Sequence, residues 1–122
     1  MNPTQEAKRL VDDAFGGSGN WDRNYARARA LIEAALESDP DNITLLTCLG
    51  AILSDTGQHA QAVPVLKRAV KLGSTDRHTY FNLAVATLNR GSHVRADKLF
   101  AQAAGLQGGS ETWEAYFDPH GH

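Results

Sequence analysis

The sequence predicts an all-α fold, an α-solenoid of about three helix–turn–helix repeats with a short C-terminal capping helix. The first observation is a repeated stretch, because Gly57–Ala69 returns 34 residues later as Gly91–Ala103. The second is a set of four columns at the same spacing, each with three similar or equivalent side chains. The columns are Tyr25, His59 and His93; Ala28, Ala62 and Ala96; Ile32, Leu66 and Phe100; and Ala35, Ala69 and Ala103. A period of 34 residues, with a large apolar side chain between two small ones, is typical of stacked helix pairs.

Length and composition predict one folded domain. The 122 residues have room for three repeats and a terminal cap of about twenty residues. The apolar fraction of 42% and the charged fraction of 21% are ordinary for a globular chain. A net charge of -2 with no basic stripe disfavours nucleic acid as a partner. With one cysteine, no signal-like start and no long apolar run, we expect a cytoplasmic protein that has no disulfide and does not enter a membrane.

Repeat one is expected over about residues 4–42, with an irregular first helix and an inserted loop. Thr4 suits the N-cap of the first helix, and the glycine-rich run Gly16–Asn20 ends that helix. A second helix is expected over about residues 23–38, because four apolar side chains share one face there and Pro40 follows. The loop between the two helices is longer than a tight turn, as is common in terminal repeats.

Repeat two is expected over residues 43–76 and repeat three over residues 77–110, each as two helices joined by a glycine-containing turn. Pro64 falls early in the second helix of repeat two, where it forfeits one backbone hydrogen bond and predicts a mild kink rather than a break. Two helices cross closely only where side chains are small. Gly50 permits such a crossing, while Leu66 fills the space beside it.

The end of the chain is expected to form the cap, over residues 111–118. Ser110 would begin a short aromatic-rich helix and Pro119 would limit it to about two turns. Its aromatic side chains would cover the apolar edge of repeat three, or dock on a second copy of the chain to give a homodimer. These side chains are Trp113, Tyr116 and Phe117, and for Trp113 a cap is favoured over a ligand contact.

Taken repeat by repeat, the large and small side chains follow one known pattern. Repeat two supplies Leu46, Leu49, Gly50, Leu53, Gly57, Ala62, Leu66 and Ala69, and repeat three supplies Tyr80, Leu83, Ala84, Gly91, Ala96, Phe100 and Ala103. Repeat one matches mainly in its second helix, through Tyr25, Ala28, Ile32, Ala35 and Pro40. With these residues the chain resembles the tetratricopeptide repeat family over nearly 90 residues. The departures are Thr87, where the family usually has an aromatic residue, and Ser74 and Gly108, which replace the proline that closes a repeat.

The resemblance implies a protein-binding module with a concave groove lined by the first helix of each repeat. The groove positions of the family correspond here to Thr44, Thr47, Ala51, Ser54 and Asp55 in repeat two, and to His78, Phe81, Val85, Leu88 and Asn89 in repeat three. Relatives that clamp a C-terminal carboxylate carry Lys, Arg and Asn on these faces. A matching basic cluster is missing from this sequence, so we set that mode of binding aside.

Three of the groove positions form one apolar stripe. Phe81, Val85 and Leu88 lie at helical spacing and would suit the apolar face of a partner helix or an extended partner segment. Thr47, Asp55 and Asn89 would supply polar contacts beside the stripe, as the resemblance implies. The alternative is that the stripe makes ordinary core contacts with a neighbouring helix. The sequence leaves the two alternatives open.

No catalytic, metal or cofactor site is predicted. His59 and His93 recur at the repeat period, which indicates packing. His120 and His122 are two ligands where a structural metal site needs about four. Cys48 is expected to be a buried or groove-lining thiol rather than a nucleophile.

Our main hypothesis is a small adaptor or chaperone-like module that holds a segment of another protein in its groove. The alternative is a structural self-assembly protein that dimerises through the aromatic C-terminal helix. An enzyme is not expected, because no acid/base pair can be assembled from the sequence.

Overall fold

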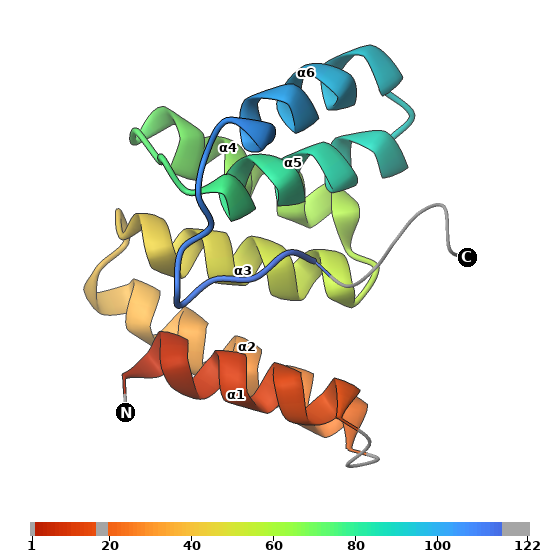
Figure 1. The fold of residues 1–122 in the computed structure, drawn as a ribbon. Helices are drawn as coiled ribbons and strands as arrows, with labels where there is room; N and C mark the ends of the chain where they lie inside the picture. The colour runs from red at the N-terminus through yellow and green to blue at the C-terminus, as the bar shows by residue number, and fades with distance from the viewer. Residues whose placement is uncertain (1, 17–19, 116–122) are drawn as a thin grey trace.

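The computed structural model describes residues 2–16 and 20–115, and it places six helices there. They are α1 (Pro3–Phe15), α2 (Trp21–Ser38), α3 (Ile43–Asp55), α4 (His59–Lys71), α5 (Arg77–Asn89) and α6 (His93–Ala104). Consecutive helices form three pairs, and the pairs stack one on the next (Figure 1). The first helices of the pairs are neighbours, because α1 packs on α3 and α3 packs on α5. The predicted all-α solenoid is confirmed.

The first pair begins differently from expectation. The N-cap of α1 is Asn2 rather than Thr4, and its side chain and that of Gln5 form a reciprocal capping box. Pro3 follows at the first helical position, where its missing N–H costs nothing. Thr4 is therefore inside the helix. The second helix begins at Trp21, two residues earlier than expected, and the Trp21 ring packs on Tyr25 one turn later at a centroid distance of 4.5 Å.

The turns within the second and third pairs share one geometry. Gly57 and Gly91 lie one repeat apart and have φ angles of 79° and 90°. Each donates its N–H to the carbonyl three residues earlier, at 3.0 Å and 2.9 Å. Only glycine adopts such a φ without a steric penalty, so the turn requires it at both positions. The repeat seen in the sequence is thus a repeat in backbone conformation.

The helices of the second pair cross at Gly50. A Cβ atom built on Gly50 would overlap the side chain of Leu66, which is fully buried. Leu66 lies in a cluster with Leu53, Ala62, Leu83 and Ala86, which joins the second pair to the third. The predicted close crossing is confirmed, and α4 runs on through Pro64.

A second hydrophobic cluster fills the space between α1, α2 and α3. Its members include Val11, Tyr25, Ile32 and Ile52, together with Trp113 from the far end of the chain. Trp113 is only 4% exposed. The C-terminal part of the chain therefore contributes to the core of the first two pairs rather than to the outer edge of the third.

Residues 109–115, called here the C-terminal segment, do not form the expected helix. After α6 the chain passes the N-terminal end of α5 and then runs along α3, with residues 112–115 outside any helix or turn (Figure 1). Helices of about two turns are marginal on their own, and here the backbone bonds to the groove instead. Tyr116 and Phe117 lie outside the described residues. The expectation that Trp113 covers the edge of repeat three is wrong, because Trp113 belongs to the hydrophobic cluster of α1, α2 and α3.

Candidate functional site

The C-terminal segment lies on the face formed by α1, α3 and α5. Each of these helices donates a side-chain hydrogen bond to a carbonyl oxygen of the segment. The donors are Lys8 Nζ, Cys48 Sγ and Asn82 Nδ2, at 3.1, 3.3 and 2.8 Å. The acceptors are main-chain atoms, so these contacts do not depend on which side chains the segment carries. This face therefore holds an extended chain by its backbone, and it is called the groove below.

Asn82 makes the most complete of these contacts. Its Nδ2 donates to the carbonyl of Trp113 at 2.8 Å, and its Oδ1 accepts the N–H of Ala115 at 2.7 Å. One residue of a parallel β-strand pairs with its neighbour in the same way, through the C=O of residue i and the N–H of residue i+2. Asn82 is fully buried, so both hydrogen bonds form in a region shielded from water.

Trp113 is the anchor of the segment. Its indole Nε1 donates to Asp55 Oδ2 at 3.1 Å, and the hydroxyl of Tyr25 donates to the same oxygen at 2.6 Å. Asp55 is 3% exposed, and a buried carboxylate is costly unless hydrogen-bond donors surround it. The anchor pocket thus combines the apolar cluster of α1, α2 and α3 with one carboxylate that requires N–H or O–H donors.

The N-terminal end of α5 holds the first part of the segment. Asp76, the N-cap of α5, accepts hydrogen bonds from the N–H of His78 at 2.8 Å, the N–H of Gly109 at 2.9 Å and the hydroxyl of Thr112 at 2.6 Å. His78 Nδ1 lies 2.7 Å from the same hydroxyl. Because the hydroxyl proton is directed to Asp76, His78 Nδ1 must be the donor, which fixes the tautomer. Burial lowers the pKa of His78, while the nearby charge of Asp76 opposes this shift, so the neutral ring is favoured at neutral pH.

Two glycines let the chain pass close to this end of α5. A Cβ atom on Gly108 would overlap the ring of His78, and one on Gly109 would lie 2.8 Å from Asp76 Oδ2. Gly108 appeared in the sequence only as a departure from the family pattern. In the structure it allows the C-terminal segment to turn into the groove.

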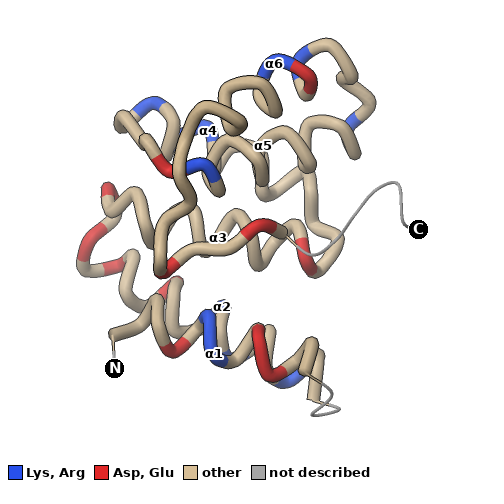
Figure 2. The backbone as a smooth tube through the Cα atoms, viewed as in Figure 1, with Lys and Arg blue, Asp and Glu red and all other residues tan. Residues whose placement is uncertain are grey.

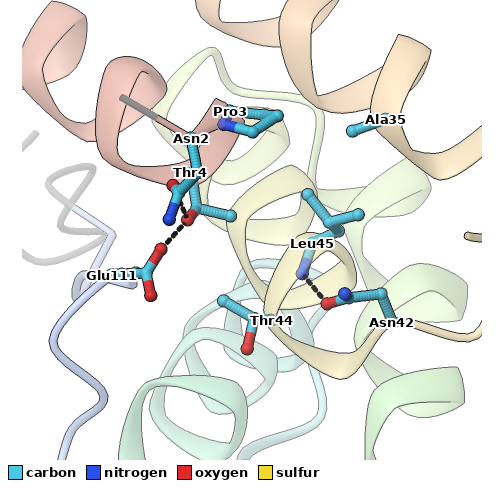
Figure 3. Close-up of a pocket in the computed structure, with 8 residues that line it drawn as sticks. All are labelled: Asn2, Pro3, Thr4, Ala35, Asn42, Thr44, Leu45 and Glu111. Carbon is cyan, nitrogen blue, oxygen red and sulfur yellow. Dashed lines mark hydrogen bonds between the residues drawn. The ribbon is translucent and has the colours of Figure 1, made fainter.

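Four of the ten residues predicted to line the groove lie beside the segment or its anchor. Asp55 and His78 bond to it directly, and Ala51 belongs to the cluster that holds Trp113. Thr44 lines a small open pocket with Glu111, at the point where Thr4 hydrogen-bonds to Glu111 (Figure 3).

Of the other six predicted residues, Thr47, Phe81 and Asn89 make contacts among the helices themselves. Thr47 Oγ1 lies 2.6 Å from Thr79 Oγ1 and so joins α3 to α5, while Phe81 packs edge-on against Phe100 of α6 at 5.4 Å. Ser54 and Val85 are buried, Leu88 is partly buried, and Asn89 donates to the carbonyl of Val85 in its own helix. Phe81 therefore packs against a neighbouring helix, which is the alternative that the sequence left open for the apolar stripe.

Sequence reasoning missed Asn82 and Asp76 as groove residues, whereas Cys48 was expected to be buried or to line the groove. Asn82 itself could have indicated the groove, because it is an amide side chain inside the apolar run Tyr80–Ala84. A helix that faced only the core would carry no amide side chain at this position. A polar side chain at such a place must find a partner. The partner lies 31 residues further along the chain and could not be read from local sequence.

Two features predicted from the sequence bear on catalysis and metal binding, namely the Cys48 thiol and the histidines. Burial raises the pKa of the Cys48 thiol to about 12, so the reactive thiolate is disfavoured. Within residues 2–16 and 20–115 there is no group of three or more His, Cys, Asp and Glu side chains that could hold a metal ion. His120 and His122 lie outside the described residues. Acidic and basic residues both occur along the described helices (Figure 2).

No helix in the described part of the chain combines the length and the apolar character that crossing a membrane requires.

Comparisons with known proteins agree with this arrangement of helix pairs. A family model described as tetratricopeptide repeat matches residues 48–111, more than half of the chain. The chain belongs to the tetratricopeptide repeat family. A second model with the same description matches residues 31–63, which extends the assignment into the second helix of the first pair. The resemblance drawn from the sequence is thereby confirmed.

A solved tetratricopeptide repeat structure has the same fold. It is described as the second TPR of Spaghetti (RPAP3) bound to the HSP90 peptide SRMEEVD. The TM-score is 0.65 at 17% sequence identity, and the alignment covers 85% of this chain and 94% of that one. Tetratricopeptide repeat domains are generally non-catalytic interaction modules, and membership of this family supports a protein–protein interaction module here.

Proposed function

We propose that this tetratricopeptide repeat protein holds an extended segment of a partner protein on the face of α1, α3 and α5, as a cytoplasmic adaptor or chaperone-like module. The single observation that carries the proposal is the Asn82 side chain, which pairs with both polar groups of a passing backbone. A groove with such a residue suits an extended peptide and does not suit a partner helix, whose backbone groups are already paired.

The proposed contacts divide into two kinds. Asn82 and Lys8 bond to main-chain atoms and give affinity for any extended chain. Asp55, Asp76 and His78 bond to side chains of the C-terminal segment, Trp113 and Thr112, and would give selectivity for a partner segment. Among the residues first predicted for the groove, Leu88 and Asn89 remain proposed contacts, whereas Phe81 is better explained by its packing on Phe100.

The alternative of a homodimer through the C-terminal segment has less support. Trp113, the one described aromatic side chain of that segment, is 4% exposed within its own chain. A dimer of this kind would require Trp113 to leave that pocket. We therefore place self-assembly second, and light-scattering mass over a range of concentrations separates the two proposals.

Affinity capture from the native cell tests the proposal. Asn82→Leu keeps the approximate size of the side chain but removes both backbone contacts, so we expect it to lose proteins that the wild type retains. The matched control is Val94→Ser, where the side chain is 71% exposed and lies on α6, which is not one of the three groove helices. Circular dichroism first establishes that both variants keep their helices. If Asn82→Leu retains the same proteins as the control, the groove is not the binding surface.

A further inference from the structure

The C-terminal segment makes the contacts of a ligand. It forms no helix, and it reaches the groove through the glycine-containing stretch 105–109. Its main-chain carbonyls accept hydrogen bonds from three different helices, and its tryptophan joins the hydrophobic cluster of α1, α2 and α3. The α-helical pairs would retain their own hydrogen bonds and turns if the segment left.

We propose that the C-terminal segment is an internal ligand, and that the partner displacing it is an extended peptide with the same chemistry: a tryptophan preceded by threonine or serine. This inference rests on the proposed function, because it names the partner of the same groove. Until such a partner arrives, the segment keeps the groove closed.

The anchor pocket selects tryptophan over phenylalanine. When the segment is displaced, Asp55 Oδ2 loses the indole N–H at 3.1 Å that helps to compensate its burial. An entering phenylalanine fills the apolar part of the pocket but brings no donor, whereas tryptophan restores the hydrogen bond. The Tyr25 hydroxyl stays bonded to the same oxygen, so phenylalanine forgoes one hydrogen bond to a buried carboxylate, and this difference favours tryptophan.

The preceding residue is selected by a hydroxyl. Asp76 Oδ2 accepts the Thr112 hydroxyl at 2.6 Å, and His78 Nδ1 contacts the same oxygen at 2.7 Å. An acceptor and a donor therefore converge on one atom, which only a hydroxyl satisfies, since it can both donate and accept. Thr112 is 1% exposed, so the residue at this place has little access to water that could replace either contact.

Tethering explains why the groove is occupied at rest. A segment joined by a short linker has an effective concentration of about 1 mM at the groove. To displace it, a free peptide must be present above this concentration or bind more tightly than the segment. The apparent affinity of a free peptide is reduced by the fraction of time in which the groove is open. Loosening the internal segment alone must then strengthen binding of a peptide added in trans.

Ala115→Pro is the variant that separates the segment from the groove. It removes the N–H that Asn82 Oδ1 accepts and leaves every pocket residue in place. The probe is a fluorescent peptide with the sequence of residues 107–115, Gln-Gly-Gly-Ser-Glu-Thr-Trp-Glu-Ala. Cys48, the single cysteine, lies under the segment and gives a second readout through its rate of reaction with a thiol reagent.

We expect the full-length Ala115→Pro chain to bind this peptide at least about tenfold more tightly than the wild type, and to expose Cys48 faster until the peptide is added. A peptide with Phe in place of Trp should bind roughly tenfold more weakly. Introducing Asn82→Leu into the Ala115→Pro chain should abolish binding of the peptide. Trp113→Ala, which empties the anchor pocket directly, serves as a second loosened variant.

Three results would overturn the proposal. The peptide could bind the wild type and Ala115→Pro equally, so that the segment is no competitor. The peptide could bind neither Ala115→Pro nor Trp113→Ala, while capture of a partner still depends on Asn82. The proposed function would then stand, but the partner would not be a peptide with threonine or serine before tryptophan. Finally, Ala115→Pro could form dimers by light scattering, which would make a second copy the occupant. Peptide binding without any Asn82-dependent capture would instead count against the proposed function alone.

Discussion

Leu66→Ala is expected to lower the free energy of unfolding by about 2–5 kcal/mol, the range for truncating a buried leucine. Leu66 is fully buried, and it joins the second helix pair to the third through Leu53 and Leu83. The crossing at Gly50 leaves the helices little freedom to close the cavity. Urea unfolding followed by circular dichroism measures the change, and a midpoint equal to that of the wild type would remove Leu66 from the core.

The substitution Gly50→Ala, at the residue that contacts Leu66, tests whether the close helix crossing causes this loss of stability. At an exposed helix position, glycine to alanine gains about 1 kcal/mol. Here the new Cβ would overlap the Leu66 side chain, so we expect a loss of about 1–3 kcal/mol instead. In the double variant with Leu66→Ala the added methyl occupies space that the leucine vacated. The double variant should therefore lose less than the sum of the two single changes.

Trp113→Ala is expected to lower the free energy of unfolding by no more than about 3 kcal/mol, the low end of the range for truncating a buried tryptophan. The ring is 4% exposed and carries the hydrogen bond to Asp55, so the lost contact is large. The loss is capped because the C-terminal segment can leave the groove while the helix pairs stay folded. The same urea titration measures the free energy, and far-UV circular dichroism before denaturant should match the wild type.

A larger loss would change the interpretation of the segment. If Trp113→Ala reduced the helical signal or cost as much as a core variant of the second pair, Trp113 would be an integral part of the core rather than a docked anchor. Phe15→Ala provides a comparison, since Phe15 is 49% exposed at the end of α1 and its truncation should cost little.

The fold was largely predictable because its signals are local and repeated. The spacing of Gly57 and Gly91 reflects one turn conformation used twice, and the Gly50–Leu66 contact follows from the need for small residues where helices cross. The start of the first helix was misplaced because Asn2, Pro3 and Gln5 together make a better cap than Thr4. The competing signals were only two residues apart.

The groove was predictable only in part. Asp55 and His78 were found because the family pattern places them on the first helices. Asn82 was missed because its role depends on an occupant, and that occupant is a segment whose own sequence indicated a helix. A core position for Trp113 could not be predicted from the sequence, because it depends on the turn of the chain over α5 that Gly108 and Gly109 allow.

The most direct test of the occupied groove is hydrogen exchange at the indole N–H of Trp113, measured by NMR on the isotope-labelled wild type. The indole of the partly buried Trp21 is an internal comparison in the same spectrum. A docked segment predicts that the Trp113 indole exchanges slowly, because it is buried and bonded to Asp55, and that Ala115→Pro speeds this exchange. Exchange in the wild type as fast as in the free peptide of residues 107–115 would contradict an extended segment held in the groove.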